Sequence, residues 1–232
     1  MPPGLNALSA RLPGLMEELR AVAQQINLRG WAEANAGNVS VNVTAEAAGL
    51  FGGACQWYLV SRGGSRYRQM ASDPLPQVLL ARVDANGEEH FPPSRKPSSE
   101  WGCHKLLQQH FLATGSEDRV VLHAHPNSII MLSQLDLYNN ETAVNSLLRE
   151  SLAELALFLP DGIATAPAAP PGSQELAECS LKAIGKRRAL IWQGHGLICT
   201  GRSPNEALDH LEVVEKAAAI ALHRIILTKI AT

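Results

Sequence analysis

The feature that most constrains the fold is the stretch Val-Val-Leu-His-Ala-His-Pro at residues 120–126. Val, Val and Leu predict a buried strand, and the proline prevents the ladder of hydrogen bonds from continuing. Alternate residues of a strand lie on the same face, so we expect His123 and His125 side by side, with Ala124 turned away. Two imidazoles at one strand end are a suitable pair of metal ligands. The alternative is a pair of core histidines satisfied by hydrogen bonds.

Strand and helix patterns interleave along the 232 residues. Apolar alternation and short apolar runs predict further strands at 39–43, 57–60, 77–83, 163–166, 189–192 and 197–200. Helical spacing predicts helices at 15–27, 100–112, 140–155, 173–185 and from 204 onward, with a short one after 127. This order indicates a single α/β domain over residues 1–232, with a mixed sheet and helices on both faces.

Local signals refine this expectation. The early strands follow one another with no predicted helix between them, which favours antiparallel pairing there. The strand at 39–43 alternates valines with polar residues and is therefore expected to be half-buried. The first residues are expected to lack regular structure. Helix caps are predicted at Ser98 or Ser99, at Asn127, at Asn140 and at Ser203, the last with Glu206 in a capping box.

Composition excludes several classes of protein. The chain is 46% hydrophobic and 18% charged with a net charge of −2, as in a soluble globular domain. No cluster of Lys and Arg predicts a nucleic-acid partner. Neither a signal peptide nor an apolar run of membrane-spanning length is present, so no membrane association and a cytoplasmic location are expected. Four widely spaced cysteines without a C-x-x-C pair favour free thiols.

A third candidate metal ligand is His195, between Gly194 and Gly196 in a turn that joins two predicted strands. Glycines allow a backbone to approach an ion closely, and a catalytic zinc commonly has three protein ligands and an open position. The remaining five histidines are expected in loops or helices as surface or packing residues: His90, His104, His110, His210 and His223.

Other candidates for chemistry lie at a helix start and in two glycine-rich loops. Glu100 lies at a helix N-terminus, where it either only assists the helix start or serves as general base and acid near the metal. The loops at 35–38 and 61–65 carry Asn, Ser and glycine, which suit a phosphate ligand, and Arg62 or Arg66 can add a charge-assisted bond. The alternative is two tight turns between strands.

Five short motifs occur together in a recognisable order, at residues 30–40, 97–100, 118–125, 160–162 and 194–196. With them the chain resembles the class II aldolase/adducin-head family from about residue 20 to 228. Within that family it is most similar to the branch that acts on L-rhamnulose 1-phosphate.

The resemblance implies a three-layer α/β/α fold around a mixed, largely antiparallel sheet. It also implies a cyclic homotetramer with active sites between subunits. His123, His125 and His195 match zinc ligands, and Glu100 matches the catalytic glutamate. The phosphate-site positions are Asn35, Gly37, Asn38 and Ser99. Glu154 falls where a second acid reaches a neighbouring subunit's site.

One segment departs from the family pattern. Where relatives have Thr-Gly-Ser-Gly or similar around the phosphate, this chain has Ser61-Arg62-Gly63-Gly64-Ser65. The usual serine is replaced by Gly63 and a glycine by Arg62. The lost hydroxyl weakens one phosphate contact, while the new guanidinium either replaces that contact or fills the pocket.

The resemblance implies a zinc-dependent lyase that cleaves a ketose 1-phosphate to dihydroxyacetone phosphate and an aldehyde. Nickel, cobalt or manganese can also occupy histidine sites. The alternatives are a sugar-phosphate dehydratase or epimerase of the same family, and a non-catalytic interaction head as in adducin.

Overall fold

The computed structural model describes residues 4–52 and 55–230. Its strands form one eight-stranded sheet in the order β4-β3-β2-β1-β5-β8-β7-β6. They are β1 (Asn38–Asn42), β2 (Gln56–Ser61), β3 (Val78–Asp84), β4 (Gly87–Phe91), β5 (Val120–Ala124), β6 (Ala164–Ala166), β7 (Ala189–Trp192) and β8 (Gly196–Gly201). Every neighbouring pair is antiparallel except β6 with β7. The prediction of a mixed, largely antiparallel sheet is confirmed.

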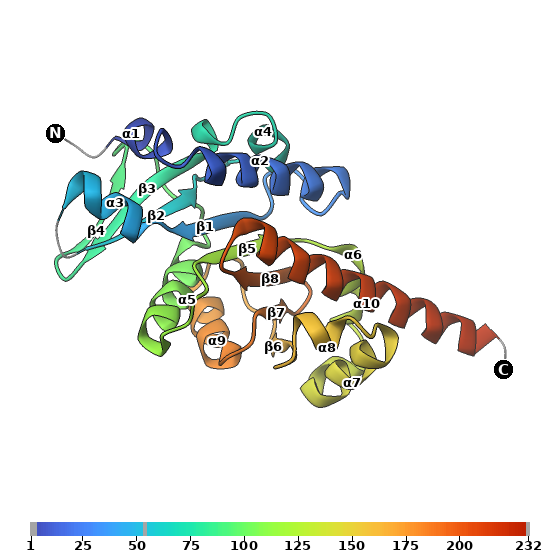
Figure 1. Cartoon of the computed structure of the whole chain (residues 1–232). Coiled ribbons are helices and arrows are strands. Elements are labelled where there is room, and N and C mark those ends of the chain that lie inside the picture. The colour runs from blue at the N-terminus through green and yellow to red at the C-terminus, as the bar shows by residue number, and fades with distance from the viewer. Residues whose placement is uncertain (1–3, 53–54, 231–232) are drawn as a thin grey trace.

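Helices cover both faces of this sheet (Figure 1). They are α1 (Leu5–Ser9), α2 (Pro13–Leu28), α3 (Thr44–Phe51), α4 (Tyr67–Met70), α5 (Trp101–Thr114), α6 (Asn127–Leu132), α7 (Glu141–Ser151), α8 (Leu155–Phe158), α9 (Gln174–Ile184) and α10 (Pro204–Ile230), with 3-10 turns η1 (Leu75–Gln77) and η2 (Asp136–Asn139). Side chains of α5 and α9 cluster with Val121 of β5. Those of α2, α6 and α10 cluster with Val120 and Leu122. Because successive residues of β5 enter opposite clusters, this strand is buried on both faces between two helical layers.

The polar face of β1 is buried, which corrects the expectation of a half-buried strand. Ser40 is fully buried, and its hydroxyl contacts His104 and Gln108 of α5. Alternation of valine with polar residues is typical of a strand with one wet face. Here the polar side chains find hydrogen-bond partners on a covering helix instead.

Some helices were not predicted from the sequence. Residues at the start of the chain form α1, and α3 lies between β1 and β2 even though these strands pair antiparallel as expected. The sequence of α3, Thr-Ala-Glu-Ala-Ala-Gly-Leu-Phe, has only one buried residue, Ala47, and therefore no apolar stripe to detect. The helix predicted over 140–155 ends at Ser151 and is followed by the separate α8.

Two helix caps are as predicted and two are not. The Asn140 side chain accepts from the backbone N–H of Ala143, and Ser203 accepts from that of Glu206. The Glu206 carboxylate, however, accepts from the backbone N–H of Arg202 rather than of Ser203. At α6 the prediction of Asn127 was wrong, because Pro126 is the N-cap. The carboxylate of Glu215 on α10 instead accepts from the N–H groups of Ser128 and Ile129.

At α5 the predicted cap was also wrong. The N-cap is Glu100, which makes no capping hydrogen bond with its side chain. Ser98 only approaches the Glu100 N–H at 3.4 Å, and Ser99 makes no cap. The Glu100 side chain is thereby left free for other contacts.

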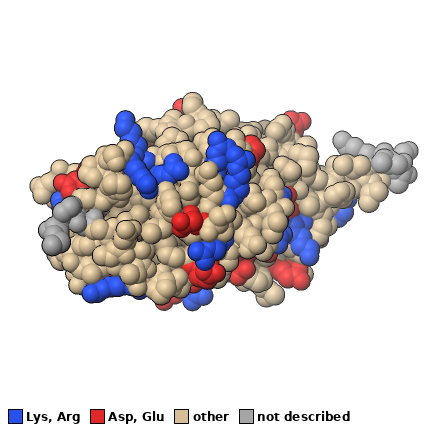
Figure 2. Space-filling model, turned by 90° about the horizontal axis from the view of Figure 1, so that it is seen from above, with Lys and Arg blue, Asp and Glu red and all other residues tan. Residues whose placement is uncertain are grey.

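The surface carries both signs of charge. On the face seen from above, Lys and Arg side chains are interspersed with Asp and Glu (Figure 2). Across residues 4–52 and 55–230, no helix is long and apolar enough to cross a membrane. The four cysteines are free thiols, as predicted.

Candidate metal centre

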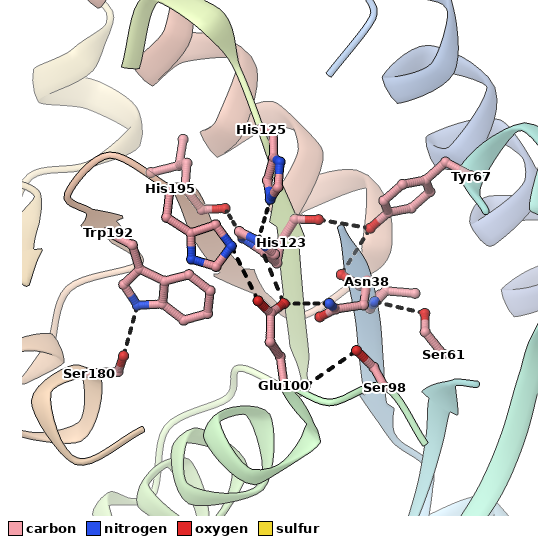
Figure 3. A network of polar contacts seen from close by, with 12 residues as sticks. Asn38, Ser61, Tyr67, Ser98, Glu100, His123, His125, Ser180, Trp192 and His195 are labelled. Atoms are coloured by element: carbon pink, nitrogen blue, oxygen red, sulfur yellow. Dashed lines mark hydrogen bonds and ion pairs between the residues drawn. The ribbon is translucent and has the colours of Figure 1, made fainter. Parts of the chain in front are cut away.

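Three histidines from two distant parts of the chain meet at one end of the sheet (Figure 3). His123 lies on β5, His125 follows it directly, and His195 lies in the turn between β7 and β8. Their ring centroids form a triangle with sides of 4.9, 4.9 and 5.0 Å. One ligand nitrogen from each ring lies within 4.8 Å of the other two. The structure therefore brings together the three residues expected as metal ligands.

The hydrogen bonds of two rings fix which nitrogens are available to an ion. Nδ1 of His123 donates to the carbonyl of Leu197 at 3.0 Å, and Nδ1 of His125 donates to the carboxylate of Glu33 at 2.8 Å. Carbonyl and carboxylate oxygens only accept, so both Nδ1 atoms carry the proton. Burial lowers the pKa of His123 to about 3, which keeps that ring neutral. Its Nε2 lone pair therefore points into the centre.

The two Nε2 atoms of His123 and His125 lie 3.1 Å apart. Because each ring already donates through Nδ1, the neutral form of either ring has no proton on Nε2 and turns a lone pair toward its neighbour. The donor set of three imidazole nitrogens is also one that zinc and other divalent metals favour. A cation at this point relieves the repulsion between lone pairs, and the residues present fit a divalent metal ion.

Glu100 lies against the histidines and is 6% exposed. One carboxylate oxygen accepts from the Asn38 side-chain amide at 2.6 Å and lies 3.6 Å from Nε2 of His123. The other oxygen lies 3.3 Å from Nε2 of His195 (Figure 3). Burial raises the pKa of Glu100. The facing imidazoles and the Asn38 amide lower it by a larger amount, so the pKa lies below its ordinary value. The carboxylate is thus ionised and held in reach of the centre.

Two glycines permit this close assembly. A Cβ on Gly196 would lie 2.5 Å from the Ala124 carbonyl oxygen and 3.0 Å from the His123 ring. A Cβ on Gly37, which has φ +73°, would lie 2.7 Å from the Tyr67 ring. These distances are too short for a side chain at either position. Beside His195, the expected close approach of the backbone therefore occurs at Gly196, against β5, and not at Gly194.

Sequence reasoning missed several residues around the centre. Trp192 stacks on His195 with an interplanar angle of 24°, and its indole N–H donates to Ser180. The Tyr67 hydroxyl lies 2.9 Å from the Asn38 carbonyl and 3.1 Å from the His123 carbonyl. Glu33 orients His125. Only Glu33 had a signal in the sequence, since it falls within the motif at 30–40.

The residues expected at a phosphate site are brought together only in part. Gly37 and Asn38 lie beside the histidines, whereas Asn35 and Ser99 are exposed. Ser61 is fully buried, and its hydroxyl accepts from the backbone N–H of Val39 at 3.0 Å.

In the loop at 61–65, which departs from the family pattern, Arg62 and Gly63 make hydrogen bonds within the protein. The Arg62 guanidinium donates to the Pro76 carbonyl, the Gly63 carbonyl and the Gln77 side chain. The Gly63 N–H donates to the Lys96 carbonyl at 2.8 Å. Of the two candidate guanidiniums, that of Arg66 lies beside the 35–38 loop, where it donates to the Ala34 carbonyl.

The remaining candidates lie apart from the centre. Glu154 is an exposed residue at the N-cap of α8. His210 is buried with Nδ1 on the Thr200 carbonyl, as expected of a packing residue. His90 belongs to β4 rather than to a loop or helix. A cavity of about 620 Å³ near Asp118 and Arg188 adjoins the end of β5 opposite the metal centre; His110 lines it, but His123, His125 and His195 do not.

Comparison with known proteins agrees with the fold. The family model described as Class II Aldolase and Adducin N-terminal domain matches residues 17–222. The rhamnulose-1-phosphate aldolase of Pectobacterium atrosepticum is 27% identical over 219 residues, covering 83% of this chain and 79% of its own. That of Listeria welshimeri is 26% identical over 231 residues, covering 88% and 81%.

Solved structures are similar over nearly the whole chain. A sugar-phosphate aldolase from Thermotoga maritima superposes with a TM-score of 0.81 at 27% identity, covering 94% of this chain and 97% of its own. The L-fuculose-1-phosphate aldolase from Thermus thermophilus has a TM-score of 0.66 at 21% identity, covering 93% and 96%. At that identity the second comparison supports the fold alone.

Proposed function

The chain belongs to the class II aldolase and adducin N-terminal domain family, and from this premise we propose that it is a zinc-dependent aldolase. Its substrate is a ketose 1-phosphate similar to L-rhamnulose 1-phosphate, cleaved to dihydroxyacetone phosphate and an aldehyde. One observation carries the proposal: the Glu100 carboxylate lies between Asn38 and a triangle of imidazoles. The names of the curated relatives support the substrate class.

His123, His125 and His195 hold the metal. Three histidines with an open fourth position are typical of catalytic zinc, and the side chains of His125 and His195 remain partly exposed. When bound, the metal supplies a Lewis acid that stabilises negative charge on the carbonyl and hydroxyl oxygens of the substrate.

Glu100 moves the proton. It accepts the proton of the hydroxyl group on the carbon beyond the bond to be cleaved, so that this carbon becomes the carbonyl of the aldehyde product. The electron pair of the broken C–C bond remains on the ketose fragment, which takes up one proton to give dihydroxyacetone phosphate. We assign that protonation to Glu154 of a neighbouring subunit in a homotetramer, because Glu154 of the same chain lies apart from the centre.

The phosphate binds beside the loop at 35–38. Asn35 and Ser99 are exposed and supply side-chain donors, Gly37 and Asn38 shape the loop, and Arg66 lies next to it. Ser61, Arg62 and Gly63 hold the neighbouring loops together through the contacts described above. The departure from the family pattern thus replaces a phosphate contact by a loop contact.

The test combines metal analysis with a panel of ketose 1-phosphates, scored for release of dihydroxyacetone phosphate. We expect a divalent metal at one equivalent per subunit and two carbon fragments as products. Glu100→Gln should retain the metal and lose about 10²–10⁴-fold in turnover, the usual contribution of a general acid–base group. Glu178→Gln, an exposed change on α9, is the control.

Three outcomes would redirect the assignment. Products with an intact carbon chain would indicate a dehydratase or epimerase. Full turnover by Glu100→Gln would remove that residue from the mechanism. Absence of both bound metal and metal-dependent turnover would favour an adducin-like interaction domain.

A further inference from the structure

A buried polar layer lies directly behind the Asn38–Glu100 contact. Asn38 and Ser40 point from the same face of β1 toward α5, where Glu100 and His104 lie one turn apart. The Asn38 amide donates to Glu100 at 2.6 Å, and the Ser40 hydroxyl lies 3.0 Å from Nδ1 of His104. The strand and the helix are therefore joined by two parallel pairs of polar residues, Asn38–Glu100 and Ser40–His104, which we call the two rungs.

The spacing of the two rungs matches in both elements. Residues two apart in a strand are separated by about 6.6 Å, and residues four apart in a helix by about 6 Å along its axis. Two rungs fix both the height and the rotation of a helix on a strand, whereas one rung leaves the helix free to pivot. The second rung thus holds α5 in register with β1 at the point where Glu100 begins the helix.

Burial of this polar layer costs folding free energy. His104 is 1% exposed, and burial lowers its pKa to about 4, which keeps it neutral. The Ser40 hydroxyl oxygen accepts from the Gln108 amide at 3.2 Å, and the same hydroxyl pairs with Nδ1 of His104. Within the described part of the chain, neither Nε2 of His104 nor Oε1 of Gln108 has a hydrogen-bond partner. Apolar side chains would avoid this penalty, so stability alone does not explain the layer.

Glu100 depends on this register more than a residue inside the helix would. It is the N-cap of α5, with φ −88° and ψ 3°, and its carbonyl accepts the backbone N–H of His104 at 3.1 Å. His104 is therefore hydrogen-bonded to Glu100 through its backbone N–H and to Ser40 of β1 through its ring. Displacement of a reacting group by 1 Å can reduce turnover by about 10²-fold.

We propose that His104, through its bond to Ser40, is a positioning residue that sets the place of the Glu100 carboxylate relative to the three histidines. The inference rests on the proposed function of Glu100. It extends that function from the metal centre to a second layer between β1 and α5.

The test compares His104→Leu, His104→Asn and Ser40→Ala in metal-loaded protein. His104→Leu should lower kcat by about 10- to 100-fold, with KM within about twofold and metal content unchanged. Asparagine places an acceptor near the position of Nδ1, so His104→Asn should recover most of the loss. Because both residues belong to one rung, Ser40→Ala combined with His104→Leu should be no worse than His104→Leu alone.

His210→Leu is the matched control, since it also removes a buried histidine with a hydrogen bond. It should lower stability without changing kcat. An equal loss of kcat in both leucine variants, or an unchanged kcat in His104→Leu, overturns the proposal. If His104→Leu does not fold, Ser40→Ala decides, and an unchanged kcat there overturns it equally.

A crystal structure of Ser40→Ala separates this proposal from the proposed function. A longer Asn38–Glu100 distance than in the wild type supports the positioning role even if no aldolase substrate is found. An unchanged distance overturns it. Wild-type protein without lyase activity contradicts only the proposed function.

Discussion

Nδ1 of His125 lies 2.8 Å from a carboxylate oxygen of Glu33, a residue 92 positions earlier in the chain. This contact holds the imidazole with Nε2 turned toward the metal centre. It also ties the loop that carries Asn35 and Asn38 to one of the three proposed metal ligands. Residues that orient a ligating histidine through its second nitrogen affect metal affinity almost as strongly as the ligands.

Removal of this carboxylate should weaken metal binding. We expect Glu33→Ala to raise the dissociation constant for zinc by about 10- to 100-fold, and Glu33→Gln to have a smaller effect because its amide oxygen still accepts. Competition with a coloured chelator measures the constant. Glu17→Ala changes a glutamate of similar exposure that pairs with Arg20 and should leave zinc affinity unaltered. Equal affinity in all four proteins would mean that the contact does not orient His125.

Metal removal should lower thermal stability through the three histidines. A ligand that binds only the folded state, at 100 times its dissociation constant, adds about 2.7 kcal/mol. Wild-type protein treated with a chelator should therefore melt at a lower temperature and recover on addition of zinc. His195→Ala should gain little from zinc, whereas His223→Ala, on the exposed side of α10, should behave as wild type. A full gain in His195→Ala would place the metal elsewhere.

The packing of Gly196 against β5 should make any side chain there destabilising. A methyl group on Gly196 would meet the Ala124 carbonyl at 2.5 Å, and overpacking of this kind costs about 1–3 kcal/mol. Gly102 on α5 has open space around it, so Gly102→Ala should instead stabilise by about 0.5–1 kcal/mol. Urea denaturation of both variants measures the difference, and a neutral Gly196→Ala would show that the two strands separate readily.

Acid should remove the contribution of Glu206. Hydrogen bonds from Arg202, more than the opposing effect of burial, lower the pKa of this carboxyl from 4.5 to about 2. A depressed folded-state pKa means that the stabilisation is complete above pH 4.5 and is lost as the pH falls toward 2. Glu206→Gln should therefore be less stable than wild type at about pH 6, by no more than about 1 kcal/mol for such an accessible pair.

The two proteins should converge near pH 2, and the difference at about pH 6 should shrink in high salt. Denaturant titrations at each pH supply the measurement. A difference that persists unchanged at the acid end of the titration would assign the effect of Glu206 to packing rather than to charge.

Local periodicity was sufficient to predict most of the architecture. Residues 120–125 carry apolar and histidine positions whose alternation alone puts His123 and His125 on one face, and the ring contact in the structure confirms this. The glycines around His195 marked a turn between two apolar strands, and that turn joins β7 to β8. Both features depend on a few adjacent residues, which is why sequence reasoning found them.

Contacts between distant segments were beyond such reasoning. Nothing near Ser40 indicates that α5 will bury it, because the hydrogen-bond partners arrive from 64 and 68 residues later. The cap of α6 was misassigned for the same reason, since Glu215 replaces a local cap from 87 residues away. The partners of Arg62, a candidate phosphate ligand in the sequence, also come from a later segment, since Pro76 and Gln77 of η1 follow it by 14 and 15 residues.

The position of β5 in the middle of the sheet has a consequence for folding. It pairs with β1 from the first part of the chain and with β8 from the last, and both pairings are long-range. Such contacts form slowly because distant segments must be brought together before they are stabilised. His195 lies in the turn that leads into β8, so the candidate metal centre is complete only when β8 has paired with β5. Metal uptake during refolding will therefore report the completed fold, and a fragment that ends before residue 189 will not form the centre.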